Sequence, residues 1–264
     1  MQAEQTQQQQ PEPTFEERKI REEEQGEQTQ SLDARTAEGR HVIDQFYYNL
    51  PAQADVEQWY AGFTPEGYDE WARCVNFTEP YHIIDQCVKS EEEGGLQIPR
   101  TAVCMDIGSG TGIVGQAMQK AGFTKLHALD VSTNFLDAVR ERGFYCEHHN
   151  FFLGRGVDQF PAELKNHFDV ITASGVWMPG HMPNAALDDV HVALKMGGVL
   201  VTAMRNTMWQ DGVFEGYKEK FESLINAGKF EVVKKENFWR GTENGTGLFA
   251  KQQSTLLVLR KIAE

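Results

Sequence analysis

The sequence predicts an α/β protein: a doubly wound, mostly parallel sheet of seven strands, with an antiparallel C-terminal hairpin and additional N-terminal helices. Three observations predict this class. The 264 residues have room for one large α/β domain. From residue 100 onward, short apolar segments alternate with amphipathic ones, an order that implies right-handed crossovers and a parallel sheet. The last two apolar segments are joined by a glycine-rich connector without a helix, so they should pair antiparallel.

The first half of the predicted core is two strand–helix units followed by a third strand. The first strand runs directly into a glycine-rich loop, and the helix after that loop ends at Gly122. The next helix ends near Gly143. We expect strands at 102–107, 125–131 and 145–151, and helices at 113–121 and 134–141.

The second half repeats the pattern and then departs from it. A short apolar strand precedes a helix that should stop at Gly197 and Gly198, and a further apolar strand follows. A last helix leads to two strands joined by the connector 241–247. We expect strands at 169–173, 199–204, 230–238 and 254–259, and helices at 184–194 and 214–227.

The N-terminal region divides into two parts that precede the core, which we place at 100–264. Residues 1–38 are rich in Gln and Glu and almost free of large apolar side chains, so we expect a disordered tail. Residues 39–99 should form a helical cap segment. It would hold a helix at 42–50 that Pro51 stops, and then an irregular aromatic stretch at 59–71.

A second cap helix should start at Pro80, a favourable residue for a first helical turn. Four side chains at helical spacing are expected to form its apolar face. They are Tyr81, Ile84, Cys87 and Val88.

Composition excludes several classes of function. The formal charge is −14, from 39 acidic and 25 basic residues, so nucleic acid is disfavoured as a partner. No apolar stretch is long enough to span a bilayer, and the N-terminus has no apolar signal region, so we expect a cytoplasmic protein. The four cysteines form no CxxC pair or Cys/His cluster, which predicts reduced thiols and no metal site. Nothing in the sequence specifies an oligomeric state.

The strongest local signal is the glycine loop after the first predicted strand. It has an acidic-x-G-x-G-x-G pattern, formed by Asp106, Gly108, Gly110 and Gly112, with Ser109 inside the loop. Ligands of open α/β sheets bind outside the carboxyl ends of the strands. Glycines at that place let the backbone turn tightly and approach a ligand closely. The pattern therefore predicts a cofactor site.

Two cofactors compete for this loop. A dinucleotide fingerprint, G-x-G-x-x-G, would need a third glycine where Ile113 stands. The carboxylate of Asp106 would repel a pyrophosphate, but it suits the amino group of the methionine moiety of S-adenosylmethionine. These electrostatics favour S-adenosylmethionine over NAD.

Asp130 ends the second predicted strand, twenty-four positions after Asp106, and Val131 follows it. An acidic residue at this place can accept hydrogen bonds from both ribose hydroxyls, in either cofactor. Its other interpretation is a helix N-cap, but Ser132 or Thr133 is better placed for that role. The loop and Asp130 together indicate nucleoside binding.

With these residues in view, the chain resembles class I S-adenosylmethionine-dependent methyltransferases over residues 40–262. Within that superfamily it is most similar to the methyltransferase-like family of the Williams–Beuren syndrome region. The stretches that carry the resemblance run from Trp59-Tyr60 through Pro65 to Tyr68-Asp69, then the glycine loop, Gly122-Phe123 with Leu126-His127, and 195–205 (KMGGVLVTAMR).

The resemblance implies further contacts with the cofactor. Tyr60 and Tyr68 correspond to tyrosines that close over it, although ordinary aromatic packing explains them equally well. Asn150 stands where the superfamily usually has an Asp that reaches the adenine amino group, and its carbonyl oxygen can make the same bond. Phe151 would lie against the adenine ring. The methionine half or the transferred methyl group would lie near Ser174, Gly175 and Val176.

No motif defines the methyl acceptor. Ser174 to Pro179 does not fit the pattern of adenine or glutamine N-methyltransferases, and no Pro-Cys nucleophile is present. A small-molecule acceptor is favoured, and a protein acceptor stays open. His181 is the best-placed base for a hydroxyl acceptor, although a solvated loop histidine is the simpler interpretation. Aromatic and polar residues at strand ends could line an acceptor pocket: Trp177, Met178, Arg205 and Trp209.

Three functions therefore stay open: a methyltransferase for a small molecule, a protein that binds S-adenosylmethionine without catalysis, and, least favoured, an NAD-dependent oxidoreductase.

Overall fold

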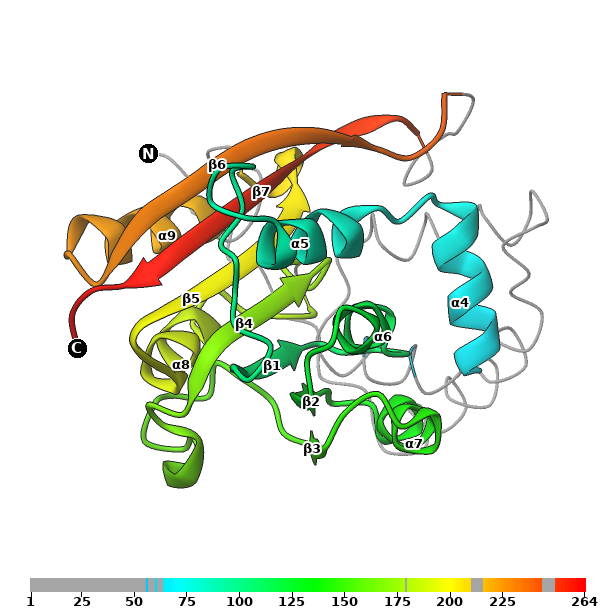
Figure 1. Cartoon of the computed structure of the whole chain (residues 1–264), viewed down its shortest axis with the longest axis horizontal. Helices are drawn as coiled ribbons and strands as arrows, with labels where there is room; N and C mark the ends of the chain where they lie inside the picture. The colour runs from blue at the N-terminus through cyan, green and yellow to red at the C-terminus, as the bar shows by residue number, and fades with distance from the viewer. Residues whose placement is uncertain (1–55, 57–59, 61–63, 179, 210–215, 244–249) are drawn as a thin grey trace, which may run out of the picture.

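The computed structural model describes residues 56, 60, 64–178, 180–209, 216–243 and 250–264 (Figure 1). The predicted tail at 1–38 and the predicted helix at 42–50 lie outside the described residues. Among the described helices, none combines the length and the apolar character that crossing a bilayer requires.

The centre of the molecule is a seven-stranded sheet with the order β3-β2-β1-β4-β5-β7-β6. The first five strands in this order pair parallel. β7 pairs antiparallel with both β5 and β6. The predicted fold class is therefore confirmed. The strands are β1 (Val103–Ile107), β2 (Lys125–Leu129), β3 (Glu147–His149), β4 (Phe168–Ser174), β5 (Leu194–Arg205), β6 (Phe230–Arg240) and β7 (Gln252–Lys261).

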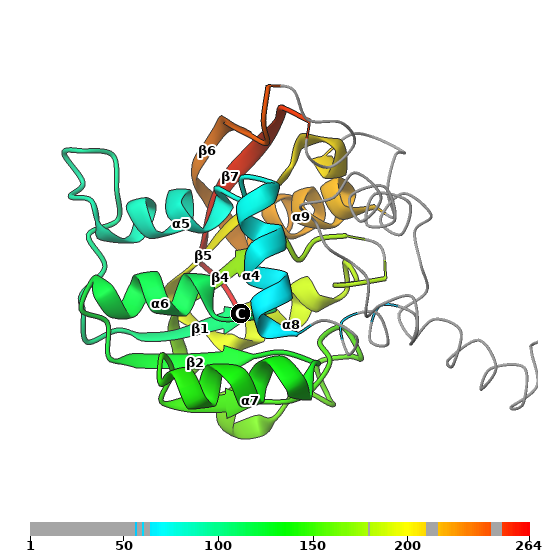
Figure 2. The same cartoon turned by 90° about the vertical axis from the view of Figure 1, so that its right-hand side faces the viewer.

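Helices cover both faces of the sheet (Figure 2). α5, α6 and α7 bury apolar side chains with one face, and α8 and α9 with the other. α4 lies beyond the carboxyl ends of β1 and β4 (Figure 1). The helices are α4 (Pro65–Cys74), α5 (Glu79–Val88), α6 (Ile113–Lys120), α7 (Thr133–Arg142), α8 (Ala186–Ala193) and α9 (Tyr217–Asn226), with short 3-10 helices η1 (Ala162–Leu164) and η2 (Asn206–Trp209).

The order of the strands fixes the position of a ligand site. The chain runs from β1 outward to β2 and β3, and then returns to β4 on the other side of β1. The loops that follow β1 and β4 therefore diverge at the sheet's switch point and leave a crevice there.

The aromatic stretch predicted to be irregular contains a helix, α4, so that prediction was wrong. Thr64 caps it, because its hydroxyl accepts a hydrogen bond from the Gly67 N–H at 3.1 Å. Pro65 occupies the first turn and Glu66 places an acidic group there, which favours the helix dipole.

The predicted apolar face of α5 also needs correction. Tyr81 is 61% exposed. Instead, Pro80, Ile83, Ile84 and Cys87 are buried, at the i, i+3, i+4, i+7 spacing of one helix face.

Gly197 and Gly198 were predicted to stop a helix, but they lie inside β5. Between two paired positions β4 advances from Phe168 to Val170, while β5 advances from Leu194 to Val199. The extra residues form a bulge in β5, where Gly197 adopts φ +78°.

Candidate functional site

The glycine loop connects β1 to α6 and turns back on the end of β2. The N–H groups of Gly108 and Ser109 both donate to the carbonyl of Leu129, at 2.8 and 3.1 Å. Gly108 has φ +65°, and a Cβ there would lie 2.3 Å from Cγ1 of Val176. Glycine is therefore required at 108 by the backbone and by the close approach of the loop after β4.

Asp130 holds the loop and the start of α7 together. One carboxylate oxygen accepts from the Gly110 N–H at 2.7 Å, and the other from the Ser132 N–H at 2.9 Å. Burial raises the pKa of Asp130, while these N–H groups act in the opposite direction. Ser132 is the N-cap of α7, as expected, since its hydroxyl accepts from the Phe135 N–H.

Asp106 is buried and engaged within the protein. Its carboxylate accepts hydrogen bonds from the hydroxyls of Tyr145, at 2.7 Å, and Thr172, at 2.9 Å. Tyr145 in turn accepts from the Gly115 N–H at 3.0 Å. Burial raises the pKa of Asp106 to about 7 against the two hydrogen bonds, which lower it. The sequence argument took this group as ionised; with this pKa it is ionised only in part at neutral pH.

Two hydroxyls at this place lack partners. Among the described residues, Oγ of Ser109 and Oγ of Ser174 are buried without a hydrogen bond. Both side chains line a small cavity with Asp106, next to the main one. Buried polar atoms are normally satisfied, so a polar ligand is the natural partner for this pair.

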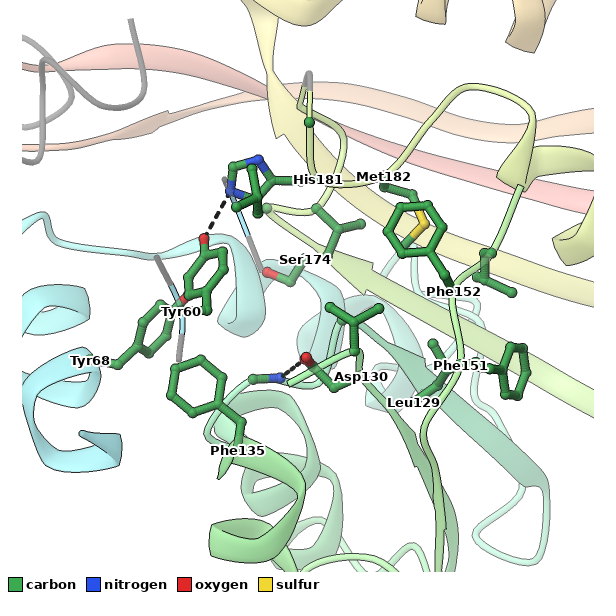
Figure 3. Close-up of a pocket in the computed structure, with 18 residues that line it drawn as sticks. Tyr60, Tyr68, Leu129, Asp130, Phe135, Phe151, Phe152, Ser174, His181 and Met182 are labelled. Carbon is green, nitrogen blue, oxygen red and sulfur yellow. Dashed lines mark hydrogen bonds between the residues drawn. The ribbon is translucent and has the colours of Figure 1, made fainter. Parts of the chain in front are cut away.

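The main cavity, so named because most of the predicted site residues line it, lies at the strand ends beside Tyr60, with about 720 Å³ of space free of protein atoms, part of it open to solvent. An aromatic group closes one side (Figure 3). The ring of Tyr60 lies 6.2 Å from that of Tyr68 and 5.9 Å from that of Phe135. Tyr60 Oη lies 3.0 Å from Nε2 of His181. His181 is therefore part of the cavity wall and bonded to a tyrosine.

The opposite side of the cavity is mostly apolar and includes Leu129, Leu153 and Met182. Phe151 also lines it, but its ring packs 5.8 Å from that of Phe160 and points away from Asp130 and Ser174 (Figure 3). The stacking of Phe151 on adenine therefore has no support in this side-chain position.

Most of the predicted site residues meet in this one cavity. Asp106 and Ser109 line the adjoining small cavity instead. Gly112 is the left-handed N-cap of α6. Asn150 lines neither cavity, and its amide donates to the carbonyls of Asp130 and Val131. The residues brought together are Tyr60, Tyr68, Gly108, Gly110, Asp130, Val131, Phe151, Ser174, Gly175 and His181.

Sequence reasoning missed several wall residues. Phe135 is on the first turn of α7 and was seen only as part of a helix. Others are neighbours of predicted positions, so the carboxyl ends of the strands were a usable signal. These are Leu129, Phe152, Leu153 and Met182.

A second cavity adjoins the first and shares Tyr60, Tyr68 and Gly175 with it. Three of the four residues suggested for an acceptor pocket line it, namely Trp177, Met178 and Arg205. Trp209 does not; it packs against Phe221 and under the ammonium group of Lys235.

In the described part of the chain, no group of three or more His, Cys, Asp or Glu side chains is arranged to hold a metal ion.

Comparison with known proteins agrees with this geometry. Residues 105–200 match the model of a methyltransferase domain family. Methyltransferase-like protein 27 of Homo sapiens is 25% identical over 184 residues, which cover 70% of this chain and 71% of that protein.

Two solved structures share the fold. A protein from the complex with the Haloferax volcanii Trm112 methyltransferase activator has a TM-score of 0.54 and 12% identity, covering 77% of this chain and 98% of that one. The MccD protein has a TM-score of 0.50 and 14% identity, covering 70% and 99%.

The domain match over residues 105–200 and the human relative are similarities to methyltransferase proteins, and the two solved structures show that the fold is shared.

Proposed function

We propose that this chain binds S-adenosylmethionine in the cavity at the carboxyl ends of β1, β2 and β4 and transfers its methyl group to a small molecule. The observation that carries the proposal is that the glycine loop is bonded to a carboxylate, Asp130, and lies beside two buried hydroxyls, Ser109 and Ser174, that have no partner among the described residues.

The residues fit the two halves of this cofactor. The carboxylate oxygens of Asp130 each accept one N–H bond and keep a lone pair for a ribose hydroxyl. Leu129 and Leu153 offer an apolar surface to the adenine. At the other end, Ser109 and Ser174 can bind the polar groups of the methionine moiety, and Asp106 supplies the negative charge that its amino group requires.

When bound, the cofactor supplies the electrophilic methyl group, and the protein positions the acceptor. Tyr60, Tyr68 and Phe135 would exclude water from one side of the cavity. His181 lies in the wall with Nε2 bonded to Tyr60, so it is placed to take a proton from a hydroxyl acceptor through a local rearrangement.

A dinucleotide is disfavoured by the sheet as well as by the loop. The dinucleotide-binding fold has the strand order 3-2-1-4-5-6. Here the antiparallel β7 is inserted between β5 and β6.

The finer assignments belong to the same proposal. We propose membership of the methyltransferase-like family of the Williams–Beuren syndrome region; the similarity to human Methyltransferase-like protein 27 supports the broader relation to methyltransferase-like proteins. We also propose a cytoplasmic location and no nucleic-acid partner, and the formal charge of −14 supports the second of these.

Titration calorimetry with S-adenosylmethionine, S-adenosylhomocysteine and NAD tests the cofactor. We expect binding of the first two and none of NAD, and binding of NAD alone would refute the proposal. In Ser109→Ala/Ser174→Ala the affinity for S-adenosylmethionine should fall roughly tenfold, because two hydrogen bonds are lost. The matched control is Ser223→Ala, on the exposed surface of α9, which should bind like the wild type.

Transfer is tested separately with methyl-labelled cofactor and small-molecule metabolite extracts. Labelled product is the expected result. Cofactor binding without labelled product across many extracts would instead indicate a non-catalytic binding protein.

A further inference from the structure

The second cavity contains a buried ion pair that the cofactor site does not use. Glu79, in the first turn of α5, and Arg240, the last residue of β6, both line it. Arg240 Nη1 lies 2.9 Å from Glu79 Oε1, and the two side chains are only 6% and 1% exposed. Removing two charges from water is costly, so a pair this deep needs further hydrogen bonds to be tolerated.

The pair is incompletely satisfied by the described residues. Glu79 Oε1 accepts from Arg240 and also from the hydroxyl of Ser254, at 3.2 Å. Glu79 Oε2 and Arg240 Nε are buried and have no hydrogen-bond partner in the described part of the chain. One carboxylate acceptor and one guanidinium donor are thus left over, although a two-point Arg–carboxylate pair would have used both groups.

The remaining walls of this cavity are mostly aromatic and apolar, with Arg205 as the further charged side chain. Trp177 is nearly completely buried, Phe77 lies 5.7 Å below the guanidinium of Arg240, and Met204 is at the end of the sheet. Arg205 also lines the cavity, with Nη2 2.8 Å from Sδ of Met178. The cavity adjoins the cofactor cavity, because Tyr60, Tyr68 and Gly175 line both.

Resting on the proposed function, we propose that the Glu79–Arg240 pair recognises the methyl acceptor, and that the acceptor is a planar, apolar, uncharged small molecule carrying a carboxamide-like polar group. Such a group donates one hydrogen bond to Glu79 Oε2 and accepts one from Arg240 Nε, so both orphan atoms are satisfied together. The pair is already neutral as a unit, so an ionised acid or amine gains nothing from it and loses its own hydration.

Four probes with one ring system test this selectivity: 2-naphthamide, 2-naphthoate, 2-naphthylmethylamine and 2-methylnaphthalene. Each is titrated into full-length protein saturated with S-adenosylhomocysteine, with binding followed by protein NMR. We expect the naphthamide to bind about tenfold more tightly than the other three, because only it satisfies both orphan atoms. Equal affinities, or no binding of the naphthamide, would overturn the proposal.

The decisive variant is Glu79→Gln/Arg240→Met, which removes both charges together and keeps an acceptor for Ser254. Removing both members of a buried pair avoids the cost of an isolated charge, so the variant should fold. It should bind S-adenosylhomocysteine like the wild type and lose the preference for the naphthamide. A preserved preference would show that the pair is only structural.

The matched control is Asp188→Asn/Lys220→Met, which removes an ion pair between α8 and α9 and should leave all four affinities unchanged. Failure of the wild type to bind S-adenosylhomocysteine would count against the proposed function instead, so the two failures are distinguishable.

Discussion

The two adjoining cavities are built in different ways. The part of the cofactor cavity expected to hold the ribose is formed by backbone and short side chains at strand ends, namely Gly108, Gly110 and Asp130, while aromatic and apolar side chains surround it. Large side chains from α4, α5, β5 and β6 contribute to the second cavity. Its ion pair joins Glu79 and Arg240, which lie far apart in the sequence.

This difference separates what the fold dictates from what the particular chain adds. A glycine turn after a strand and an acid at the end of the next strand are enforced by backbone geometry and a nucleoside's shape. Nothing in the backbone requires a glutamate at 79 or an arginine at 240. The second cavity is therefore where we expect the specificity of this protein to lie.

The largest expected effect concerns the cofactor cavity. Asp130→Ala should lower the affinity for S-adenosylmethionine by about 100-fold or more, since it removes two charge-assisted hydrogen bonds to the ribose. The structure adds a second consequence, because the N–H groups of Gly110 and Ser132 lose their acceptor. The free energy of unfolding should fall by about 1–3 kcal/mol. Calorimetry and urea denaturation measure the two effects.

Asp130→Asn is the matched control for that variant. Its amide oxygen can keep one of the two backbone hydrogen bonds. Relative to Asp130→Ala, the free energy of unfolding should therefore return closer to the wild-type value than the cofactor affinity does. Wild-type affinity in Asp130→Ala would mean that the ribose lies elsewhere.

A second prediction uses pH. The pKa of Asp106 is raised to about 7 in the folded protein, from an ordinary value of 3.8. A raised carboxyl pKa favours the protonated form when folded, so this group's stabilising contribution is fully present below pH 4 and is lost as the pH rises toward 7. The cofactor's amine has the opposite preference, because it requires the carboxylate. Affinity should therefore rise roughly tenfold from pH 5.5 to 7.5, with release of a proton.

Calorimetry in two buffers of different ionisation enthalpy measures that proton. In Asp106→Asn the dependence on pH should be strongly reduced, while Asp130, the other acidic group that affects this carboxyl, is retained. An identical pH profile in this variant would exclude Asp106 as the partner of the amine.

The fold was predictable because it depends on local patterns. Alternation of strands and helices, and a hairpin joined without a helix, were enough to predict the order of layers and the antiparallel end of the sheet. The helix α4 was missed although the sequence contains a helix-start signal for it, Thr64 followed by Pro65. The rotation of the α5 face toward Ile83 instead of Tyr81 depends on what the helix packs against, which spacing alone does not define.

Only the part of the site formed by the glycine loop and Asp130 was predictable from the sequence. Asp130 and the glycines have positions set by the strands that precede them. The hydrogen bonds to Asp106 come from Tyr145, just before β3, and from Thr172 in β4. The Glu79–Arg240 ion pair likewise depends on tertiary packing. Contacts of this kind carry no fixed sequence spacing, so a single sequence does not reveal them.

The smallest expected effect concerns the boundary between the two cavities, where Tyr60 belongs to both. Tyr60→Phe removes the hydroxyl that bonds to His181 Nε2 but keeps the ring that packs on Phe135. Cofactor affinity should fall by only about threefold, because one neutral hydrogen bond contributes roughly 1 kcal/mol or less. Tyr60→Ala, which also removes the ring, should cost distinctly more. Equal losses in the two variants by calorimetry would show that the hydroxyl, and with it the link to His181, closes the cavity; a loss confined to the alanine variant assigns that role to the ring.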